Sequence, residues 1–167
     1  MITIGVDCGL TGAVAFIDER GSCVVEDLPT VDLPGTGLIK RRIDGRALAN
    51  LILRCTIPGE PVQAYVEQVS TMGGTLGNAV QTQGSLMRTL GAVETVLEML
   101  RMPPVMVVPR TWKRLYGLNS SKADTLTIAR KLYPATAASR LKRALDHNRA
   151  DAVLIAHYGR IEKELIG

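Results

Sequence analysis

Residues 2–18 read ITIGVDCGLTGAVAFID, and this stretch decides the fold. Apolar residues alternate with Thr3, Gly5 and Asp7, which is the two-residue period of a β-strand. Gly9 and Gly12 supply a turn, so residues 13–18 return as an antiparallel strand. Asp7 is the unexpected residue, because burying a carboxylate without a partner is unfavourable. It needs a metal ion, the counter-ion of a bound phosphate, or exposure at the strand end.

The rest of the chain predicts strands that alternate with helices. Residues 22–28 complete a three-stranded antiparallel meander, and 62–69 (VQAYVEQV) and 103–109 (PPVMVVP) are β-rich runs, the latter a buried one. Helices are predicted over 45–55, capped by Asp44, and over 78–102, 110–117, 123–132 and 146–164. The segment 31–42, rich in Gly and Pro and then basic, predicts a loop, plausibly mobile. This order favours an α/β fold with a mixed five-stranded sheet and helices on its faces.

Length and composition favour one intracellular domain spanning 1–167, since 167 residues are enough for one core. We expect a cytoplasmic protein without a membrane partner, because no apolar run approaches the ~20 residues of a membrane span and the N-terminus lacks a signal-peptide pattern. The cysteines, Cys8, Cys23 and Cys55, have neither zinc-site nor disulfide spacing and are predicted to be free thiols, buried or half-buried.

Positive charge is concentrated in one part of the chain. Residues 101–149 contain eleven basic and two acidic residues, a net charge of +9, whereas the remainder contains nine basic and fourteen acidic residues, a net charge of −5. Such an asymmetry favours a surface that binds a polyanion such as DNA, although a solvated helical surface is the simpler alternative. The candidate DNA contacts in this part are Lys113, Arg114, Lys122, Arg143 and Arg149.

Three carboxylates interrupt otherwise apolar elements: Asp7, Glu67 and Asp151. Each alone has a structural explanation, as a turn cap, an exposed strand end or one charge of an amphipathic helix. In a mixed sheet of this order, however, the first and fourth strands can be neighbours, and the last helix can bring the third carboxylate to them. Clustered carboxylates favour Mg²⁺ or Mn²⁺. Two such ions about 4 Å apart can catalyse phosphodiester hydrolysis.

A fourth ligand is open between His147 and Asp146. His147 lies four residues before Asp151, on the same helix face, and could act as ligand or as proton shuttle. Asp146 is off that face and is a natural helix N-cap.

Three glycines mark further positions. Gly84 and Gly91 lie seven residues apart on one face of the predicted long helix, where they favour close approach to another element or a dimer contact. Gly5, on the same side of its strand as Asp7, is expected to leave the backbone open to an ion and a phosphate.

These residues resemble those of a known family. The segments IGVDCGLTGAVAFID, AYVEQV and DHNRADAVLIAHYG are similar to the three acidic motifs of RuvC-type Holliday-junction resolvases, which have the RNase H-like fold. The segments VVPRTWKRLYGL and SSKADTLTIARKLYP resemble the plant chloroplast and phage-borne branch, in which a P…WK motif and a later lysine precede the last acidic helix. The similarity spans essentially the whole chain.

The resemblance implies a homodimer that makes paired, symmetric nicks in four-way DNA junctions with Mg²⁺ or Mn²⁺, in a bacterial or phage-infected cell. The implied metal ligands are Asp7, Glu67 and Asp151, and Lys122 would lie near the scissile phosphate. The loop TMGGTLGN would enter the junction centre, with Met72, Gly73, Gly74 and Thr75 as DNA contacts.

The chain departs from the family pattern at two positions. Cys8 stands where a proline follows the first aspartate, and Asn148 stands where Asp or His usually lies three residues before the last aspartate. Alternatives are another RNase H-fold nuclease for flap or hybrid substrates, a non-catalytic junction-binding module, and a sugar-kinase or actin-like ATPase. The last of these folds duplicates the domain, and 167 residues supply one copy.

Overall fold

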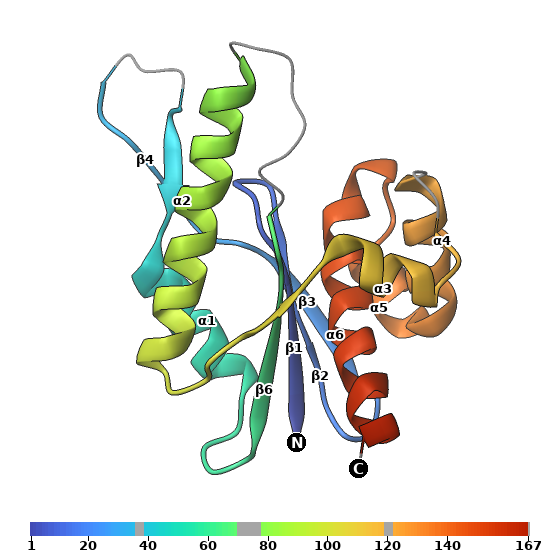
Figure 1. Cartoon of the computed structure of the whole chain (residues 1–167). Helices are drawn as coiled ribbons and strands as arrows, with labels where there is room; N and C mark the ends of the chain where they lie inside the picture. Colours follow the sequence, from blue (N-terminus) through green and yellow to red (C-terminus); the bar gives the residue numbers. More distant parts are fainter. Residues whose placement is uncertain (36–38, 70–77, 119–121, 167) are drawn as a thin grey trace.

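The central element is a five-stranded mixed sheet with the spatial order β3-β2-β1-β6-β7 (Figure 1). The computed structural model describes residues 1–35, 39–69, 78–118 and 122–166, with all their side chains except those of 78–82, 122–123 and 164–166. β1 (Ile2–Asp7), β2 (Ala13–Ile17) and β3 (Cys23–Asp27) form the antiparallel meander, and β6 (Val62–Glu67) and β7 (Val105–Val107) continue it in parallel with β1. The predicted sheet, with its first and fourth strands as neighbours, is confirmed.

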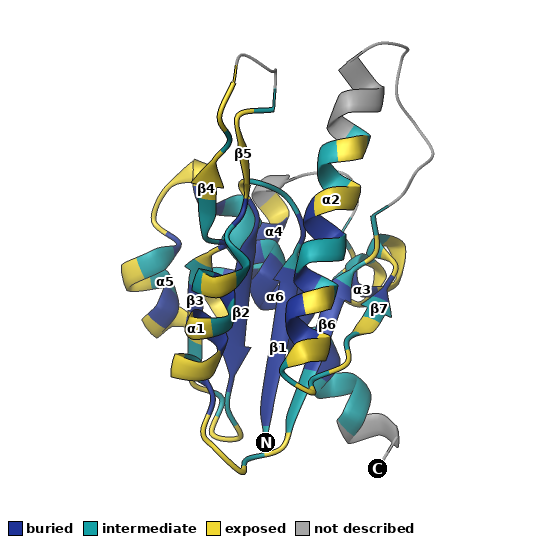
Figure 2. Cartoon of the chain, turned by 90° about the vertical axis from the view of Figure 1, so that its left-hand side faces the viewer, coloured by how far each residue is buried: buried dark blue, intermediate teal, exposed yellow. Residues whose placement is uncertain are grey.

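Helices cover both faces of this sheet (Figures 1 and 2). One face packs on α1 (Gly45–Cys55) and α2 (Asn78–Met99). The other face carries α6 (His147–Ile166), surrounded by α3 (Pro109–Leu115), α4 (Lys122–Leu132), α5 (Pro134–Arg140) and a short 3₁₀ turn (Ala144–Asp146). As predicted, the Asp44 side chain caps α1 by accepting a hydrogen bond from the backbone N–H of Ala47 at 3.0 Å.

The two-residue period of β1 divides its side chains between two cores. Ile4 and Val6 are buried with α1 and α2, whereas Gly5 faces the backbone of α6. Asp7 lies two residues beyond Gly5 and therefore belongs to the α6 face of the sheet.

At Gly5, α6 lies closer to β1 than any side chain would permit. A Cβ at Gly5 would lie 2.2 Å from the backbone nitrogen of Ala156 and 2.4 Å from the backbone oxygen of Ala152. The same helix meets β6 at Gly159, where a Cβ would lie 2.2 Å from the Tyr65 ring. Our expectation that Gly5 leaves room for an ion and a phosphate is therefore wrong, because the helix backbone fills that space.

The segment predicted as a loop over 31–42 contains a two-stranded antiparallel ribbon. Its strands are β4 (Thr30–Asp32) and β5 (Arg41–Ile43), in a sheet separate from the main one. Because the residues that join the strands are rich in Gly and Pro, the sequence pattern predicted a loop and not the short strands on either side. In Figure 1 the ribbon extends beyond the main sheet next to α2.

Two other expectations need correction. We predicted a buried run at β7, but β7 is an edge strand, in which Val105 is 40% exposed and Val107 is buried. A Cβ at Gly84 or Gly91 would meet nothing within 4 Å, so these glycines do not mediate close packing within the described part of the chain. α5 and the 3₁₀ turn were not predicted.

The three cysteines are free, as predicted, with Cys8 buried and Cys23 and Cys55 half-buried. Among the residues that the structure describes, no helix is both long enough and apolar enough to cross a membrane.

Substitution of Gly5 tests the packing of α6 on β1. We expect Gly5→Ala to lower the free energy of unfolding by about 3 kcal/mol or more, because the new methyl group would overlap backbone atoms that cannot move alone. Gly45→Ala is the matched control, since its Cβ would lie 3.5 Å from the nearest atom, a methyl carbon of Val96. Urea unfolding of both variants measures the effect, and equal stability of the two would contradict the packing argument.

Candidate active site

Asp7 and Glu67 end two adjacent parallel strands. Val6 of β1 is paired with Val66 of β6, so the next residue of each strand lies at the same edge of the sheet. Tyr65 and Glu67 share one side of β6, and the Tyr65 ring lies against α6. The two carboxylates therefore belong to the face of the sheet that α6 covers.

The third carboxylate, Asp151, comes from the first half of α6. It precedes Ala152, whose backbone oxygen is one of the atoms that crowd Gly5. Burial, together with the nearby charge of Glu67, raises the pKa of Asp151 to about 6, against smaller opposing effects of Lys113, His147 and a hydrogen bond from Thr125. Its Oδ1 atom is buried and has no hydrogen-bond partner among the described residues. Asp151 and Glu67 thus lie within electrostatic reach of each other.

Glu67 is oriented by the indole of Trp112. The Nε1–H group of Trp112 donates a hydrogen bond to Glu67 Oε1 at 3.1 Å, and the Trp112 side chain is completely buried. Burial raises the pKa of Glu67, whereas the charge of Lys113 and the bond from Trp112 lower it. No sequence pattern indicated this contact, although Trp112 belongs to the P…WK motif.

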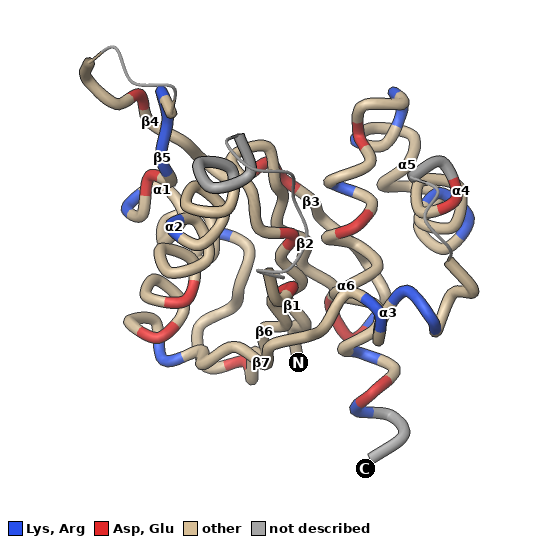
Figure 3. The backbone as a smooth tube through the Cα atoms, turned by 45° about the horizontal axis from the view of Figure 1, so that its top comes forward, with Lys and Arg blue, Asp and Glu red and all other residues tan. Residues whose placement is uncertain are grey.

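Lys113 is the cation next to these carboxylates. Its ammonium lies 5.1 Å from the centre of the Trp112 ring, and its charge lowers the pKa of both Glu67 and Asp151. Figure 3 shows the basic segment of α3 beside α6. Lys113 was predicted as a DNA contact, and its position also places positive charge at the carboxylate site.

Cys8, at the family's proline position, lies within the same electrostatic environment. Burial raises the pKa of its thiol well above the usual range, and the charges of Asp7, Glu67 and Glu94 raise it further. Cys8 is therefore a neutral, buried thiol that contacts the core under α2 and has no nucleophilic character at physiological pH.

A divalent cation fits the chemistry of these residues. Carboxylate oxygens are the ligands that Mg²⁺ and Mn²⁺ prefer, and the buried, unpartnered Oδ1 of Asp151 is the kind of atom that a cation would satisfy. No group of three His, Cys, Asp or Glu side chains is close enough to hold a metal ion within the described ranges. The predicted cluster is thus not preassembled, since like charges repel without an ion.

Asp146 is occupied by two arginines. Its oxygens accept hydrogen bonds from the Arg143 backbone N–H and guanidinium, each at 2.8 Å, and its Oδ1 lies 3.4 Å from Arg149 Nη1. Burial would raise the pKa of Asp146, but the bonds and charges of Arg143 and Arg149 outweigh it and hold the pKa below its usual range. The structure therefore argues against Asp146 as a metal ligand, because its Oδ1 is bound by two guanidinium groups and its Oδ2 by a backbone N–H.

His147 and Asn148 begin α6 with different contacts. His147 lies near enough to Asp151 to lower the pKa of that carboxyl, so it stays the candidate fourth ligand. The Asn148 amide donates to the Thr11 backbone oxygen at 2.7 Å and to Thr11 Oγ1 at 3.0 Å. Asn148 thereby ties the start of α6 to the turn between β1 and β2, a positioning role that its sequence position did not indicate.

The predicted DNA contacts have different positions. Lys113 is at the site, Arg114 is exposed on α3, and the Arg143 side chain is 66% exposed. Arg149 does not fit the prediction, because its guanidinium is bound to both Asp27 oxygens at 2.6 Å and is only 15% exposed. The remaining predicted contacts, Met72, Gly73, Gly74, Thr75 and the Lys122 side chain, lie outside the described residues.

Part of the basic excess in residues 101–149 is used inside the fold. Arg130 donates to the backbone oxygens of Leu141 and Lys142, at 2.7 and 2.9 Å. Arg140 donates to the backbone oxygen of Val25 at 3.0 Å and forms an ion pair with Glu26. Arg130 thus joins α4 to the segment after α5, and Arg140 joins the end of α5 to β3, so the count of basic residues overstates the charge available to a polyanion.

Comparisons with known proteins support the fold but not a family membership. No family model and no curated protein matches the sequence. Among solved structures, RuvC of Thermus thermophilus in complex with a Holliday junction substrate matches with a TM-score of 0.56 and 16% identity, over 96% of both chains. The structure of Thermus thermophilus RuvC by itself matches with a TM-score of 0.52 and 18% identity, again over 96% of both chains. The chain thus has a RuvC-like, RNase H-type fold.

Neutralising Asp151 and neutralising Asp146 should change the free energy of unfolding in opposite directions. Because the folded-state pKa of Asp151 is raised to about 6, its ionisation costs stability above that pH, and the cost fades as the pH falls towards the unfolded-state value. In metal-free protein at pH 7.5, we expect Asp151→Asn to raise the free energy of unfolding by up to about 2 kcal/mol. The gain should shrink at pH 5.

Asp146→Asn is the matched control. The pKa of Asp146 is lowered, so its ionised form contributes stability at neutral pH, and that stability is lost as the pH falls through its folded-state pKa. This variant should therefore unfold at a lower temperature than the unsubstituted protein at pH 7.5. Thermal unfolding with EDTA at both pH values measures the difference, and a shift of both variants in the same direction would contradict the electrostatic assignment.

Proposed function

We propose that this protein is a metal-dependent endonuclease that cuts four-way DNA junctions, in the manner of RuvC-type resolvases. The observation that carries the proposal is that Asp7 and Glu67 end neighbouring strands at one edge of the sheet, with Asp151 of α6 within electrostatic reach of Glu67, in a chain that aligns with RuvC over 96% of its length. The solved neighbour that holds a Holliday junction substrate supports branched DNA as the ligand class.

Asp7, Glu67 and Asp151 would hold Mg²⁺ or Mn²⁺, with His147 as the candidate fourth ligand. Two such ions supply an activated water and stabilisation of the leaving oxygen. The reaction adds water across one phosphodiester bond and leaves a 5′-phosphate and a 3′-hydroxyl, so that the ends can be ligated.

The residues around the carboxylates have supporting roles. Trp112 fixes the orientation of Glu67 through its Nε1–H bond to Oε1. Lys113 places positive charge where negative charge increases on the phosphate in the transition state. Lys122 is the first residue of α4, and we propose it as a second cation near that phosphate.

The contacts of Trp112 and Lys113 also favour the chloroplast and phage-borne branch within the family. Both residues belong to the P…WK motif on which that part of the resemblance depends. The hydrogen bond from Trp112 to Glu67 and the effect of the Lys113 charge on Asp151 give the motif a function at the carboxylate site.

A homodimer would place two such sites opposite each other. Symmetric nicks in two strands require two-fold symmetry, and the open glycine face of α2, at Gly84 and Gly91, offers a surface on which a second copy could approach closely. Residues 72–75, with Lys113, Arg114 and Arg143, are the proposed contacts with the junction.

Cleavage of defined DNA substrates tests this proposal. We expect paired nicks in a synthetic four-way junction with Mg²⁺ or Mn²⁺, and weaker cutting of flap, linear duplex and RNA–DNA hybrid substrates. Asp7→Asn should reduce the cleavage rate at least about 100-fold while leaving junction binding intact, because it removes a negative charge from the DNA surface.

Glu19→Gln, at an exposed position in the turn between β2 and β3, is the control and should cut normally. Equal cutting by the Asp7→Asn protein would overturn the metal assignment. Preferential cutting of hybrid or flap DNA would move the protein to another nuclease type of the same fold, and binding without any cutting would make it a junction-binding module.

A further inference from the structure

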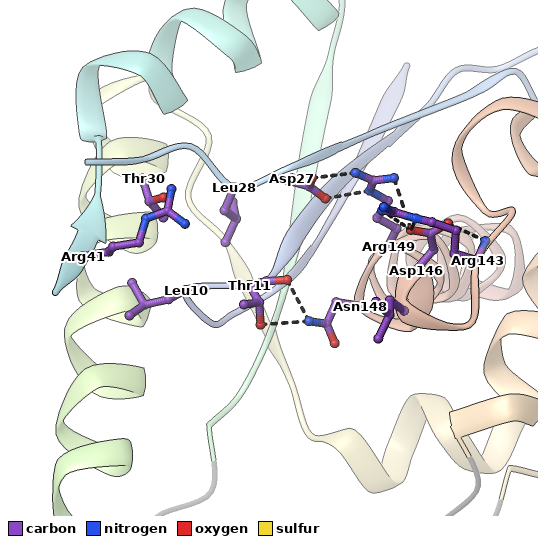
Figure 4. Close-up of a pocket in the computed structure, with 11 residues that line it drawn as sticks. Leu10, Thr11, Asp27, Leu28, Thr30, Arg41, Arg143, Asp146, Asn148 and Arg149 are labelled. Carbon is purple, nitrogen blue, oxygen red and sulfur yellow. Dashed lines mark hydrogen bonds and ion pairs between the residues drawn. The ribbon is translucent and has the colours of Figure 1, made fainter. Parts of the chain in front are cut away.

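A pocket of about 310 Å³ opens beside the candidate active site (Figure 4). Thr11 and Asn148 line it, and both border the site, since Thr11 lies in the turn after Asp7 and Asn148 lies one helical turn before Asp151. The two residues are hydrogen-bonded to each other. The pocket is therefore built on the same contact that positions the start of α6.

The two ends of the pocket each carry an arginine. In Figure 4, Arg41 of β5 lies at one end and Arg143, before the 3₁₀ turn, lies at the other. Their side chains are 55% and 66% exposed. Arg41 has only a long ion pair with Asp32, at 3.7 Å, and Arg143 is held in place by Asp146 at 2.8 Å. Both arginines can donate further hydrogen bonds to an anion.

The carboxylates of the pocket are neutralised within the protein. Asp27 binds the guanidinium of Arg149 through both oxygens, and Asp146 binds Arg143 and Arg149. The lining thus contains three arginines and two carboxylates, an excess of one positive charge. This charge pattern favours an anionic ligand.

Apolar side chains supply the rest of the surface. Leu10 and Leu28 lie between the two arginines in Figure 4, and Leu145 at the rim is 76% exposed. Thr30 adds a hydroxyl group. Cations at two ends with an apolar surface between them match the chemistry of a DNA strand segment, in which charged phosphates link the sugars and each sugar carries a flat base that can lie on an apolar surface.

We propose that this pocket binds one nucleotide of the DNA strand that continues from the scissile phosphate. The flanking phosphates contact Arg41 and Arg143, and the base lies against Leu10, Leu28 and Leu145. The proposal rests on the proposed function, and it assigns the β4–β5 ribbon to substrate binding through Arg41. A strand fixed here would enter the carboxylate site in a set register, past the Thr11–Asn148 contact.

Binding measurements in the Asp7→Asn background test the arginines without cleavage. We expect Arg41→Ala to weaken junction binding about tenfold and to lower the slope of log affinity against log salt by about 1, because one phosphate contact is lost. Arg54→Ala, on the exposed side of α1, is the matched control and should bind unchanged. Fluorescence anisotropy with a labelled junction measures both variants.

A cross-link locates the DNA without disturbing the fold. Leu145→Cys, in a Cys23→Ser, Cys55→Ser background, would carry a photoreactive benzophenone at the rim of the pocket. Leu53→Cys is the control, because Leu53 is 54% exposed but lies on α1, outside the pocket. We expect Leu145→Cys to cross-link to a nucleotide close to the cleaved bond, and Leu53→Cys to give background cross-linking.

The outcomes separate this proposal from the proposed function. If the unsubstituted protein binds no junction DNA, the proposed function fails and the nucleotide pocket fails with it. If it binds and cuts junctions, while Arg41→Ala binds normally and Leu145→Cys cross-links no better than Leu53→Cys, only the pocket assignment is overturned.

Discussion

The contact between the backbone of α6 and strand β1 at Gly5 is the constraint on which the rest of the site depends. A side chain at this position would overlap the backbone of Ala152 and Ala156, so the helix can lie this close only because residue 5 is glycine. Gly159 gives the Tyr65 ring the same room on β6. Together the two contacts fix the position of α6 on the sheet, and hence where Asp151 lies relative to the ends of β1 and β6.

This placement is electrostatically unfavourable in the absence of cations. Burial and the charge of Glu67 raise the pKa of Asp151, and one of its oxygens has no partner in the described part of the chain. Lys113 and the Trp112 indole compensate in part for Glu67. A site that lowers stability until it binds a cation is typical of a functional site. Metal binding should therefore also stabilise the fold.

A second set of contacts, ion pairs and hydrogen bonds, holds the first turn of α6 in place. Arg149 joins Asp27 of β3 to Asp146, and Asn148 joins the helix to the β1–β2 turn. These contacts explain why neighbouring residues at the start of α6 have different roles: Asp146 and Arg149 anchor the helix, whereas Asp151 lies within electrostatic reach of Glu67 and His147 within that of Asp151.

Much of the fold could be predicted from local patterns in the sequence. The alternation in residues 2–18, the β-rich run around Glu67 and the capping by Asp44 each reflect short-range rules, and the structure confirms the strands and the helix that they predict. The three carboxylates could be predicted because each interrupts an apolar element, and the adjacency of β1 and β6 then brings Asp7 and Glu67 to one edge.

What could not be predicted depends on residues far apart in the chain. The sequence does not show that Gly5 faces a helix 150 residues later, that Arg149 is paired with Asp27, or that Trp112 donates to Glu67. The arginines of residues 101–149 likewise counted as candidate DNA contacts until their internal partners were known. Short strands such as β4 and β5 leave too few residues for a period to show.

The most direct test of the account is the position of Mn²⁺ in crystals of the protein, measured by anomalous diffraction. The account predicts anomalous peaks at the edge of the sheet where β1 and β6 end, bonded to carboxylate oxygens of Asp7, Glu67 and Asp151 at about 2.1 Å. Mn²⁺ bound elsewhere, for example at Asp27, with no peak at the three carboxylates, would contradict it.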